Sequence, residues 1–239
     1  MKSLRINAVV VKRRNFLEKD RILTLFSKEQ GKVEALAKGA RRPGNRLSPN
    51  SDIATIAQFH IHQTKSIDII SEIEPIYHPF GSRGDFDKTQ RISYALKIID
   101  KLYEVETPHV NSYLILEILI KTISDNDRQL IFLRFIIEVL HDLGALPNFV
   151  ECAHCQKKIE EKDEFVFDLN TGLTHKECTT ERCLIISKEE VKLLRLLAST
   201  DIEKMLKFKA PSDIFSGAYN VMLNYFNYEF GKILPDEVL

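Results

Sequence analysis

The stretch IATIAQFHIH, Ile53–His62, alternates apolar and polar residues with a period of two. Ala57, Phe59 and Ile61 fall on one side, while Gln58 and the two histidines fall on the other. Such alternation is typical of a β-strand with one buried face and one solvated face. The stretch therefore predicts that this part of the chain forms a sheet.

Four more short apolar segments surround this strand within the first 75 residues, around residues 6–12, 21–27, 32–38 and 66–73. Each is rich in Val, Ile, Leu or Phe, and turn-prone or charged residues separate them. Since the connections leave no room for crossover helices, five such strands predict an antiparallel barrel. The five-stranded OB-fold, which commonly binds single-stranded nucleic acid, has the right size. An SH3-like barrel stays open on pattern alone.

Beyond Pro79 the apolar period becomes helical. Apolar residues recur every three or four positions from Ile92 to Leu102, which predicts a first helix. Thr107-Pro108 predicts an N-cap followed by proline at the first position of a second helix, which should end near Ser124.

Three further helices complete this part of the chain. One is expected over about 127–143 and stops at Gly144, where a left-handed C-terminal cap needs no side chain. Ser187 and Glu190 form a capping box that opens a helix through Leu197, and a last helix is expected over about 212–230. Apolar positions of the 127–143 helix are predicted to be core rather than a groove for a partner's peptide; they include Leu130, Leu133, Ile137 and Leu140.

Charge is distributed unevenly although the whole chain has 34 basic and 34 acidic residues. Residues 1–80 hold 14 Lys and Arg against 8 Asp and Glu, so a basic front precedes an acidic back. This asymmetry favours a polyanionic partner for the first part, although a solvated surface loop would also account for it.

The basic excess is concentrated in LAKGARRPGNRL, residues 36–47, which has four basic residues and no acidic one. Glycines allow a backbone to approach a phosphate closely, and arginines supply planar donors for bidentate phosphate contacts. The loop residues Lys38, Arg41, Arg42 and Arg46 are therefore the first candidates for binding the phosphates of a nucleic acid. Arg13, Arg14 and Arg21 are secondary candidates, with solvated strand ends as the alternative. Because few aromatic residues interleave with the loop, base stacking should be weak.

Four cysteines form two short pairs on either side of FVFDLNTGLTH, a predicted hairpin. Cys152 and Cys155 are separated by two residues, and Cys178 and Cys183 by four. Two thiolate pairs around a hairpin predict a zinc-ribbon-like site with four cysteine ligands and a structural Zn²⁺.

Other uses of these thiols stay open. His175 or His154 could replace a cysteine ligand, since the second pair is wider than the usual spacing. A thioredoxin-like redox pair lacks the expected βαβ context, and buried thiols without a metal are the remaining alternative. The expected organisation is an α+β multi-domain protein: residues 1–79 form the OB-fold, 80–150 and 185–239 the α-helical domain, and 151–184 the zinc-binding insertion.

No motif for export, membrane insertion or catalysis stands out. The apolar run at Ile6–Val11 is too short for a signal core or a membrane span, so a cytoplasmic protein without a membrane partner is expected. Asp68, Glu72 and Glu74 could hold Mg²⁺ in a nuclease, but solvated strand carboxylates are favoured. Neither a P-loop nor a nucleophile elbow is present, and ATP use is not predicted.

The stretch AVVVKRRNFLEKDRILTLFSKEQGKVEALAKGARRPGNRL, residues 8–47, resembles the bacterial RecO family of recombination-mediator and DNA-repair proteins. Shared features are Asp-Arg before the second strand, Gly-Lys before the third, and the Lys-Gly-Ala-Arg-Arg loop. The later order of a helical domain and an inserted cysteine cluster is also similar, as is Leu143-Gly144 shortly before the first cysteine.

The resemblance implies a non-enzymatic protein of DNA repair and homologous recombination. It would bind single- and double-stranded DNA, anneal complementary strands and, with its partner RecR, help RecA displace the single-strand-binding protein. It would act in the bacterial cytoplasm at the nucleoid. The alternative is a zinc-ribbon factor of transcription or translation, which would prefer RNA or polymerase.

Overall fold

The structure is a computed structural model that describes residues 3–79, 86–122, 128–160, 162–179, 183–205 and 211–235. Contacts divide the chain into two compact units, Met1–Asn126 and Asp127–Leu239. The first unit contains β1 Ser3–Phe16, β2 Asp20–Ser27, β3 Gly31–Ala37, the 3-10 helix η1 Pro49–Ser51, β4 Ile56–His62, β5 Asp68–Tyr77, α1 Phe86–Leu102 and α2 Val110–Lys121. The second contains α3 Arg128–Asp142, β6 Phe165–Asp168, β7 Gly172–His175, the 3-10 helix η2 Lys176–Cys178, β8 Cys183–Leu184, α4 Lys188–Ser199, α5 Ile202–Met205 and α6 Ser212–Phe230.

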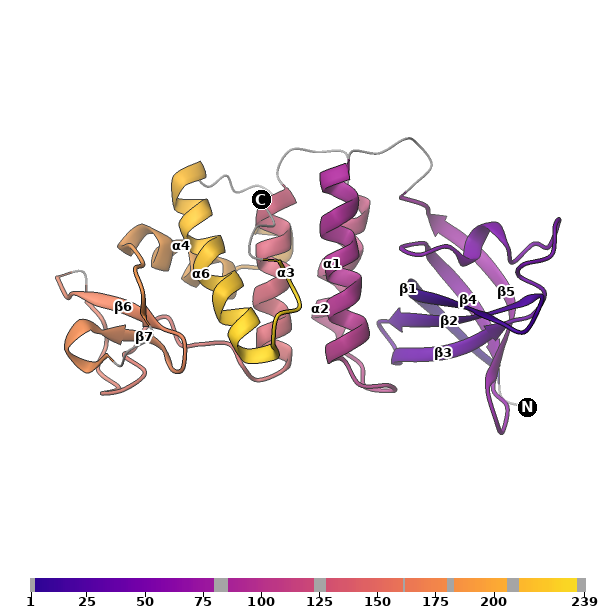
Figure 1. Cartoon of the computed structure of the whole chain (residues 1–239), viewed down its shortest axis with the longest axis horizontal. Helices are drawn as coiled ribbons and strands as arrows, with labels where there is room; N and C mark the ends of the chain where they lie inside the picture. Colours follow the sequence, from indigo (N-terminus) through magenta and orange to yellow (C-terminus); the bar gives the residue numbers. More distant parts are fainter. Residues whose placement is uncertain are drawn as a thin grey trace. The chain divides into compact units, whose positions relative to one another are not determined.

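The first five strands form a closed barrel in the order β1-β2-β3-β5-β4, with β4 returning to β1 (Figure 1). Only β3 and β5 pair in parallel, from Ala35 opposite Asp68 to Ala37 opposite Ile70. β1 is long enough to pair with β4 by its first half and with β2 by its second half, and its register shifts between Val10 and Lys12. The predicted five-stranded barrel is confirmed and its form is consistent with an OB-fold, but the expectation that it is antiparallel throughout is wrong for the β3–β5 pair.

The alternation that predicted β4 is visible in its burial. Ala57, Phe59 and Ile61 are buried, whereas the residues between them are half-exposed. β4 begins three residues later than expected, because Ala54 and Thr55 instead form backbone hydrogen bonds with Val10, at 2.8 and 2.9 Å. The inward side chains of all five strands meet in one apolar core, made of Ile6, Ala8, Val10, Leu23, Leu25, Ala35, Ala37, Ala40, Ala57, Phe59, Ile61, Ile70 and Ile73.

Contacts group α1 and α2 with the barrel, whereas the sequence assigned them to the helical domain. The expected N-cap at Thr107 is wrong, because His109 is the N-cap and α2 begins at Val110. Thr107 packs instead on the turn before β3. A Cβ at Gly31 would lie 2.0 Å from the Thr107 carbonyl oxygen, and Gly31 has a φ of +67°. Only glycine therefore fits where the linker between α1 and α2 crosses the barrel.

The helices of the second unit follow their sequence signals closely. Gly144 has a φ of +71° just after α3, and the predicted capping box closes the start of α4, where Ser187 accepts from Glu190 N at 3.2 Å. α6 has the predicted bounds, and the core positions predicted on α3 are buried. α5 was not predicted. Within the described residues, no helix combines the length and hydropathy needed to cross a lipid bilayer.

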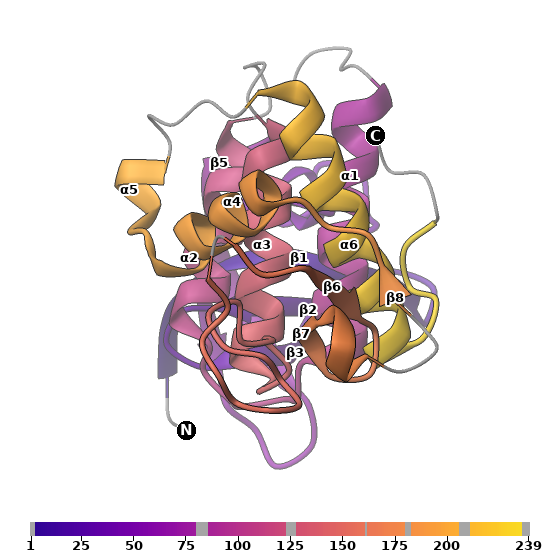
Figure 2. The ribbon, with the colours of Figure 1, turned by 90° about the vertical axis from the view of Figure 1, so that its left-hand side faces the viewer.

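The predicted hairpin exists as β6 and β7, and β8 extends it to a three-stranded sheet (Figure 2). The sheet is small, with strands of four, four and two residues. Phe167 of β6 is fully buried and packs edge-on against Tyr225 of α6, with ring centroids 5.3 Å apart. One aromatic contact thus ties the sheet to the helices of its own unit.

Candidate nucleic-acid interface and cysteine cluster

The loop between β3 and β4 is folded against one end of the barrel. Successive turns close it, with backbone hydrogen bonds from Arg42 N to Gly39 O at 2.8 Å and from Asn45 N to Arg42 O at 3.2 Å. Gly39 N also donates to the Asp20 carboxylate at 2.7 Å. The loop is therefore held in a defined shape at the end of β3.

Arg41 connects this loop to the turn between β1 and β2. Its Nη1 donates to the carbonyl oxygens of Leu17 at 3.2 Å and Glu18 at 2.9 Å. Its backbone N donates to the carbonyl oxygen of Lys19 at 3.0 Å. Part of the Arg41 guanidinium is thus used inside the protein, and its first role is to position the turn.

Three other loop cations differ from Arg41. The side chains of Lys38, Arg42 and Arg46 are exposed. Within the described part of the chain, none of their charged groups forms a hydrogen bond or an ion pair. All their donors are available for an external anion. We call these three residues the loop cations.

The three secondary candidates lie at the same end of the barrel but have internal partners. Arg13 pairs with Asp52, and Arg14 lies 3.5 Å from Glu34. Arg21 donates to Ser51 Oγ at 2.7 Å; burial and the nearby charge of Arg13 lower the pKa of Arg21. We call Arg13, Arg14 and Arg21 the paired arginines. Their charge is partly balanced before any ligand binds.

The aromatic residues of the first domain leave little surface for stacking bases. Phe26 and Phe59 are fully buried, while Phe16 and Tyr77 are half-buried. Phe80 lies outside the described residues. At this end of the barrel the large apolar side chain that is most exposed is Leu17, which the sequence analysis did not single out.

The cysteine cluster begins with a tight turn at Cys152. Cys152 N donates to Lys157 O, and Gln156 N donates to Cys152 O, both at 2.9 Å. Two backbone N–H groups also point at the Cys152 sulfur, from Cys155 at 3.5 Å and from His175 at 3.4 Å. The turn therefore presents two sulfur atoms beside the end of β7.

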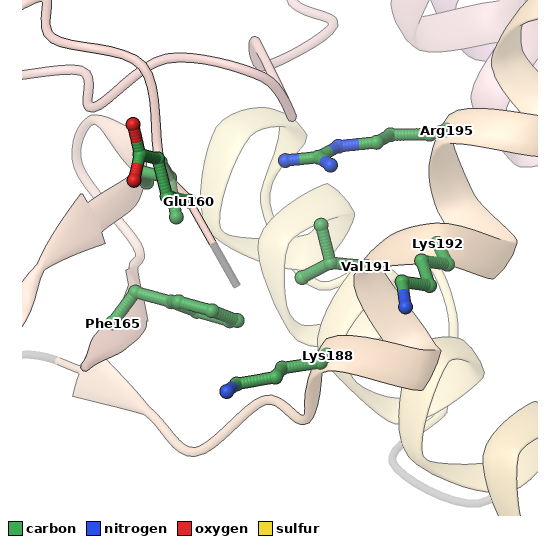
Figure 3. Close-up of a pocket in the computed structure, with 7 residues that line it drawn as sticks. Glu160, Phe165, Lys188, Val191, Lys192 and Arg195 are labelled. Carbon is green, nitrogen blue, oxygen red and sulfur yellow. The ribbon is translucent and has the colours of Figure 1, made fainter. Parts of the chain in front are cut away.

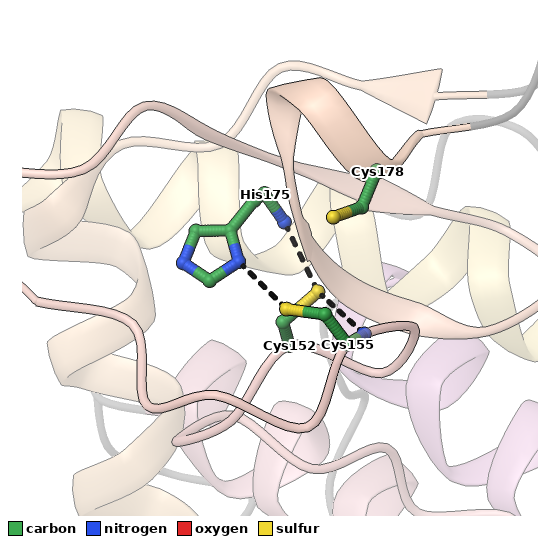
Figure 4. A group of neighbouring side chains, drawn as sticks. All are labelled: Cys152, Cys155, His175 and Cys178. Carbon is green, nitrogen blue, oxygen red and sulfur yellow. Dashed lines mark hydrogen bonds between the residues drawn. The ribbon is translucent and has the colours of Figure 1, made fainter.

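The structure gathers Cys152, Cys155, His175 and Cys178, whose ligand atoms all lie within 4.8 Å of one another (Figure 4). Ligand atoms in a tetrahedral zinc site with Zn–S bonds of about 2.3 Å are roughly 3.7 Å apart. Three sulfurs and one imidazole nitrogen are a donor set that Zn²⁺ accepts. The residues present therefore fit a structural zinc ion.

Cys183, the fourth ligand expected from sequence, is not part of this group. It lies in β8, and its sulfur contacts the hydroxyl of Thr179. His154, the other alternative, is also outside the group, although its backbone N–H lowers the pKa of Cys152. The alternative in which His175 replaces a cysteine is the one with matching geometry.

Asp163 fixes the orientation of the His175 ring. The ring Nδ1 lies 3.4 Å from the Cys155 sulfur, and Nε2 lies 3.4 Å from Asp163 Oδ2. Asp163 is itself held by a hydrogen bond from Glu160 N at 2.8 Å. A carboxylate on the far nitrogen of a ligand histidine is the usual way that proteins orient such a ring.

The electrostatics of the group also suit a cation. Burial alone would raise the pKa of the Cys152 thiol, but backbone N–H groups lower it to about 6. Burial and hydrogen bonding to Cys155 raise the pKa of Cys178 to about 11. A thiol whose pKa is lowered thus lies beside one whose pKa is raised, and a divalent cation would favour the thiolate form of both.

The acidic residues of β5 are weaker candidates for a metal site. Glu74 lies 3.0 Å from His60 and 3.4 Å from Arg5 on the exposed face of the barrel, so Arg5 offsets its charge. Asp68 is used within the turn before β5, where it accepts from Thr64 N at 2.9 Å. This arrangement agrees with solvated strand carboxylates.

A small pocket of about 50 Å³ lies beside α4, lined by Glu160, Phe165, Lys188, Val191 and Arg195 among others (Figure 3). Its size suits a water molecule rather than a substrate. The Arg195 side chain is also engaged, because its Nε donates to Phe149 O at 2.6 Å. We assign no ligand to this pocket.

Comparisons with known proteins cover both compact units. A family model described as Recombination protein O N terminal matches residues 1–79, and one described as Recombination protein O C terminal matches residues 83–236. The chain is 30% identical over 229 residues to the DNA repair protein RecO of Caldicellulosiruptor saccharolyticus, covering 94% of this chain and 92% of that protein. It is 26% identical to the DNA repair protein RecO of Desulforamulus reducens, covering 98% and 92%, and 26% identical to that of Acetivibrio thermocellus, covering 97% and 94%.

Proposed function

The chain belongs to the RecO family of DNA repair proteins, and we propose that it binds single- and double-stranded DNA at the loop end of its barrel and anneals complementary strands without catalysing a reaction. The observation that carries this proposal is the set of loop cations, which are exposed and have no partner among the residues that the structure describes. Arginine and lysine donors of this kind bind phosphate oxygens.

Phosphate contacts explain how such a protein acts on any damaged sequence. Because every nucleotide carries the same phosphate, backbone contacts give affinity without reading bases. The paired arginines would attract phosphates more weakly at the same end of the barrel, since Asp52 and Glu34 offset part of their charge. Two strands held by their phosphates keep their bases free to pair.

The proposed partners are RecR, the single-strand-binding protein and, indirectly, RecA. In this proposal the protein works with RecR to help RecA onto single-stranded DNA that the single-strand-binding protein covers. Membership of a DNA repair family supports this role, and with it a cytoplasmic location at the nucleoid. No membrane partner is proposed.

The test is annealing of complementary oligonucleotides, naked and coated with single-strand-binding protein. We expect faster annealing of both, and a lower rate for a variant with Arg42→Ala and Arg46→Ala. Lys97→Ala on α1 is the control, because this exposed residue lies outside the loop. Failure on both substrates would remove the mediator role. Tighter binding to RNA than to DNA would favour a factor of transcription or translation.

We also propose that Cys152, Cys155, Cys178 and His175 hold one structural Zn²⁺, with the sequence-based set of Cys152, Cys155, Cys178 and Cys183 as the competing assignment. The matched geometry of His175 supports the first set. With four protein ligands the ion would have no open position for a reactive water, so its role would be to hold the turn, β7 and η2 together.

Metal content distinguishes the two ligand sets. By elemental analysis, Cys183→Ser should keep about one zinc per chain, whereas His175→Ala should lose most of it. Cobalt substitution provides a second readout, because the sulfur-to-cobalt absorption band scales with the number of thiolate ligands and should be unchanged in Cys183→Ser. Loss of zinc from Cys183→Ser with retention in His175→Ala would favour the four-cysteine set.

A further inference from the structure

The turn between β1 and β2 carries a leucine in an unusual state. Leu17 is 75% exposed and has a φ of +50°, in the left-handed region. Glycine and asparagine adopt that region much more readily than leucine does, because the leucine Cβ crowds the backbone. Leucine is therefore unfavourable here in two respects, because its apolar side chain is exposed to solvent and its backbone conformation is one that leucine rarely adopts.

The loop between β3 and β4 holds this turn through Arg41. Arg41 binds the carbonyl oxygens of Leu17, Glu18 and Lys19, which are the three residues of the turn. The same loop carries the loop cations. Leu17 is therefore held against the same loop that carries the cations proposed to hold phosphates.

A single exposed leucine on a protein surface is ordinary and needs no explanation. Here exposure coincides with a left-handed backbone, three hydrogen bonds from Arg41 and a loop whose other cations form no hydrogen bond or ion pair with the residues that the structure describes. Strained residues persist where the surroundings impose them, and they concentrate at functional sites. A ligand that fits these features has both anionic groups and apolar surfaces. Single-stranded DNA has both, since it carries phosphates and exposed base faces.

We propose that Leu17 is an apolar contact for unstacked nucleobases, placed so that a strand bound through its phosphates packs a base against the leucine side chain. This inference rests on the proposed function, because the phosphates must be held at the same end of the barrel. Proteins that insert leucine or similar side chains between bases show that this contact is chemically reasonable. The turn would thereby favour splayed bases over stacked ones in the bound strand.

Leu17→Gly tests the contact, because glycine suits the left-handed turn and only the side chain is lost. Binding of the full chain is compared for a thymidine oligonucleotide and for an abasic oligonucleotide of equal length, which has the same phosphates without bases. We expect binding of the thymidine oligonucleotide to weaken about fivefold, as for partial loss of a buried leucine, and abasic binding to be unchanged. Unchanged affinity for both oligonucleotides would overturn the inference.

Three further variants complete the test. Leu17→Asn also suits the turn and replaces Leu17→Gly should the glycine variant fail to fold. Val105→Ala is the matched control, since Val105 is 58% exposed and bridges to Lys32 at the opposite end of β3 from the loop. The double variant Arg42→Ala, Arg46→Ala should weaken binding to both oligonucleotides. If it affects neither, the proposed function fails; if it affects both and Leu17→Gly affects neither, only the role of Leu17 fails.

A direct reporter is possible because the chain has no tryptophan. In Leu17→Trp, stacking of a base on the indole should quench the fluorescence with the thymidine oligonucleotide and not with the abasic one. The same measurement on Val105→Trp should show no quenching with either. Equal responses of the two tryptophans, or equal responses to the two oligonucleotides, would contradict a base contact at position 17.

Discussion

The barrel and the cysteine-containing sheet are held together in different ways. The barrel closes around a contiguous apolar core, so the loop end takes its shape without a ligand. The sheet of β6, β7 and β8 has only ten residues in strands, and beside it lie three sulfur atoms and one imidazole that could hold a metal ion. One region is a preformed surface, and the other is expected to form around what it binds.

Loss of the metal should have the largest effect on stability. It should destabilise the cysteine-containing sheet and leave the barrel unchanged. Structural zinc contributes about 10 to 16 kcal/mol in small peptides, which is of the order of a whole domain's stability. We expect Cys152→Ser to lose zinc and to make residues 151–184 sensitive to proteases, while DNA affinity at the barrel persists. Limited proteolysis with mass spectrometry locates the cuts.

Cys183→Ser is the matched control for this prediction, because Cys183 lies in the same sheet but outside the group of four. It should keep its zinc and its resistance to proteases. A wild-type chain that is fully stable without any metal would contradict the account of the sheet.

A cavity in the barrel core should have the next largest effect on stability, and this effect should be confined to the barrel. Phe59 is fully buried in the barrel core, and phenylalanine-to-alanine changes in cores cost about 3 to 5 kcal/mol. Phe59→Ala should lower the free energy of unfolding of the barrel and weaken DNA binding, with zinc content unchanged. Chemical denaturation and elemental analysis measure both. Loss of zinc in this variant would mean that the two regions do not fold independently.

A smaller effect is expected from the residue that orients His175. Asp163→Asn should weaken zinc binding about tenfold, because outer carboxylates of this kind change metal affinity by factors of about 10 to 100. Competition with a chelator measures the affinity. Glu164→Gln is the control, since the neighbouring carboxylate contacts Lys176 instead, at 2.8 Å. Equal losses in the two variants would point to general charge near the metal.

Sequence patterns predicted those features that depend on near neighbours. The alternation around Phe59 predicted β4, and the capping box at Ser187 predicted the start of α4, because both signals act within a few residues. Thr107 failed as an N-cap because a long-range contact with Gly31 fixes that linker. Helix signals are local, but the position of a linker is decided by what it packs against.

The sequence predicted most residues of the candidate sites but not the contacts that these residues make. The partners of the paired arginines become visible only once the barrel closes, since Arg13 and Asp52 are 39 residues apart in sequence. The entry of His175 into the cysteine group likewise depends on the β6–β7 hairpin, and the spacing of cysteines could not decide it. Leu17 carries a weak signal, namely leucine in a short turn where glycine or asparagine is expected.

The central claim is that the loop cations bind DNA phosphates, and the salt dependence of affinity for single-stranded DNA tests it most directly. Each phosphate contact contributes about −0.7 to the slope of log affinity against log salt. Arg42→Ala with Arg46→Ala should flatten the slope by about 1.4, equally for every base sequence. Arg13→Ala with Arg14→Ala should flatten it by less than half as much, because Asp52 and Glu34 already pair with these arginines. Equal flattening by the two pairs, or an unchanged slope in the folded loop variant, would contradict the account.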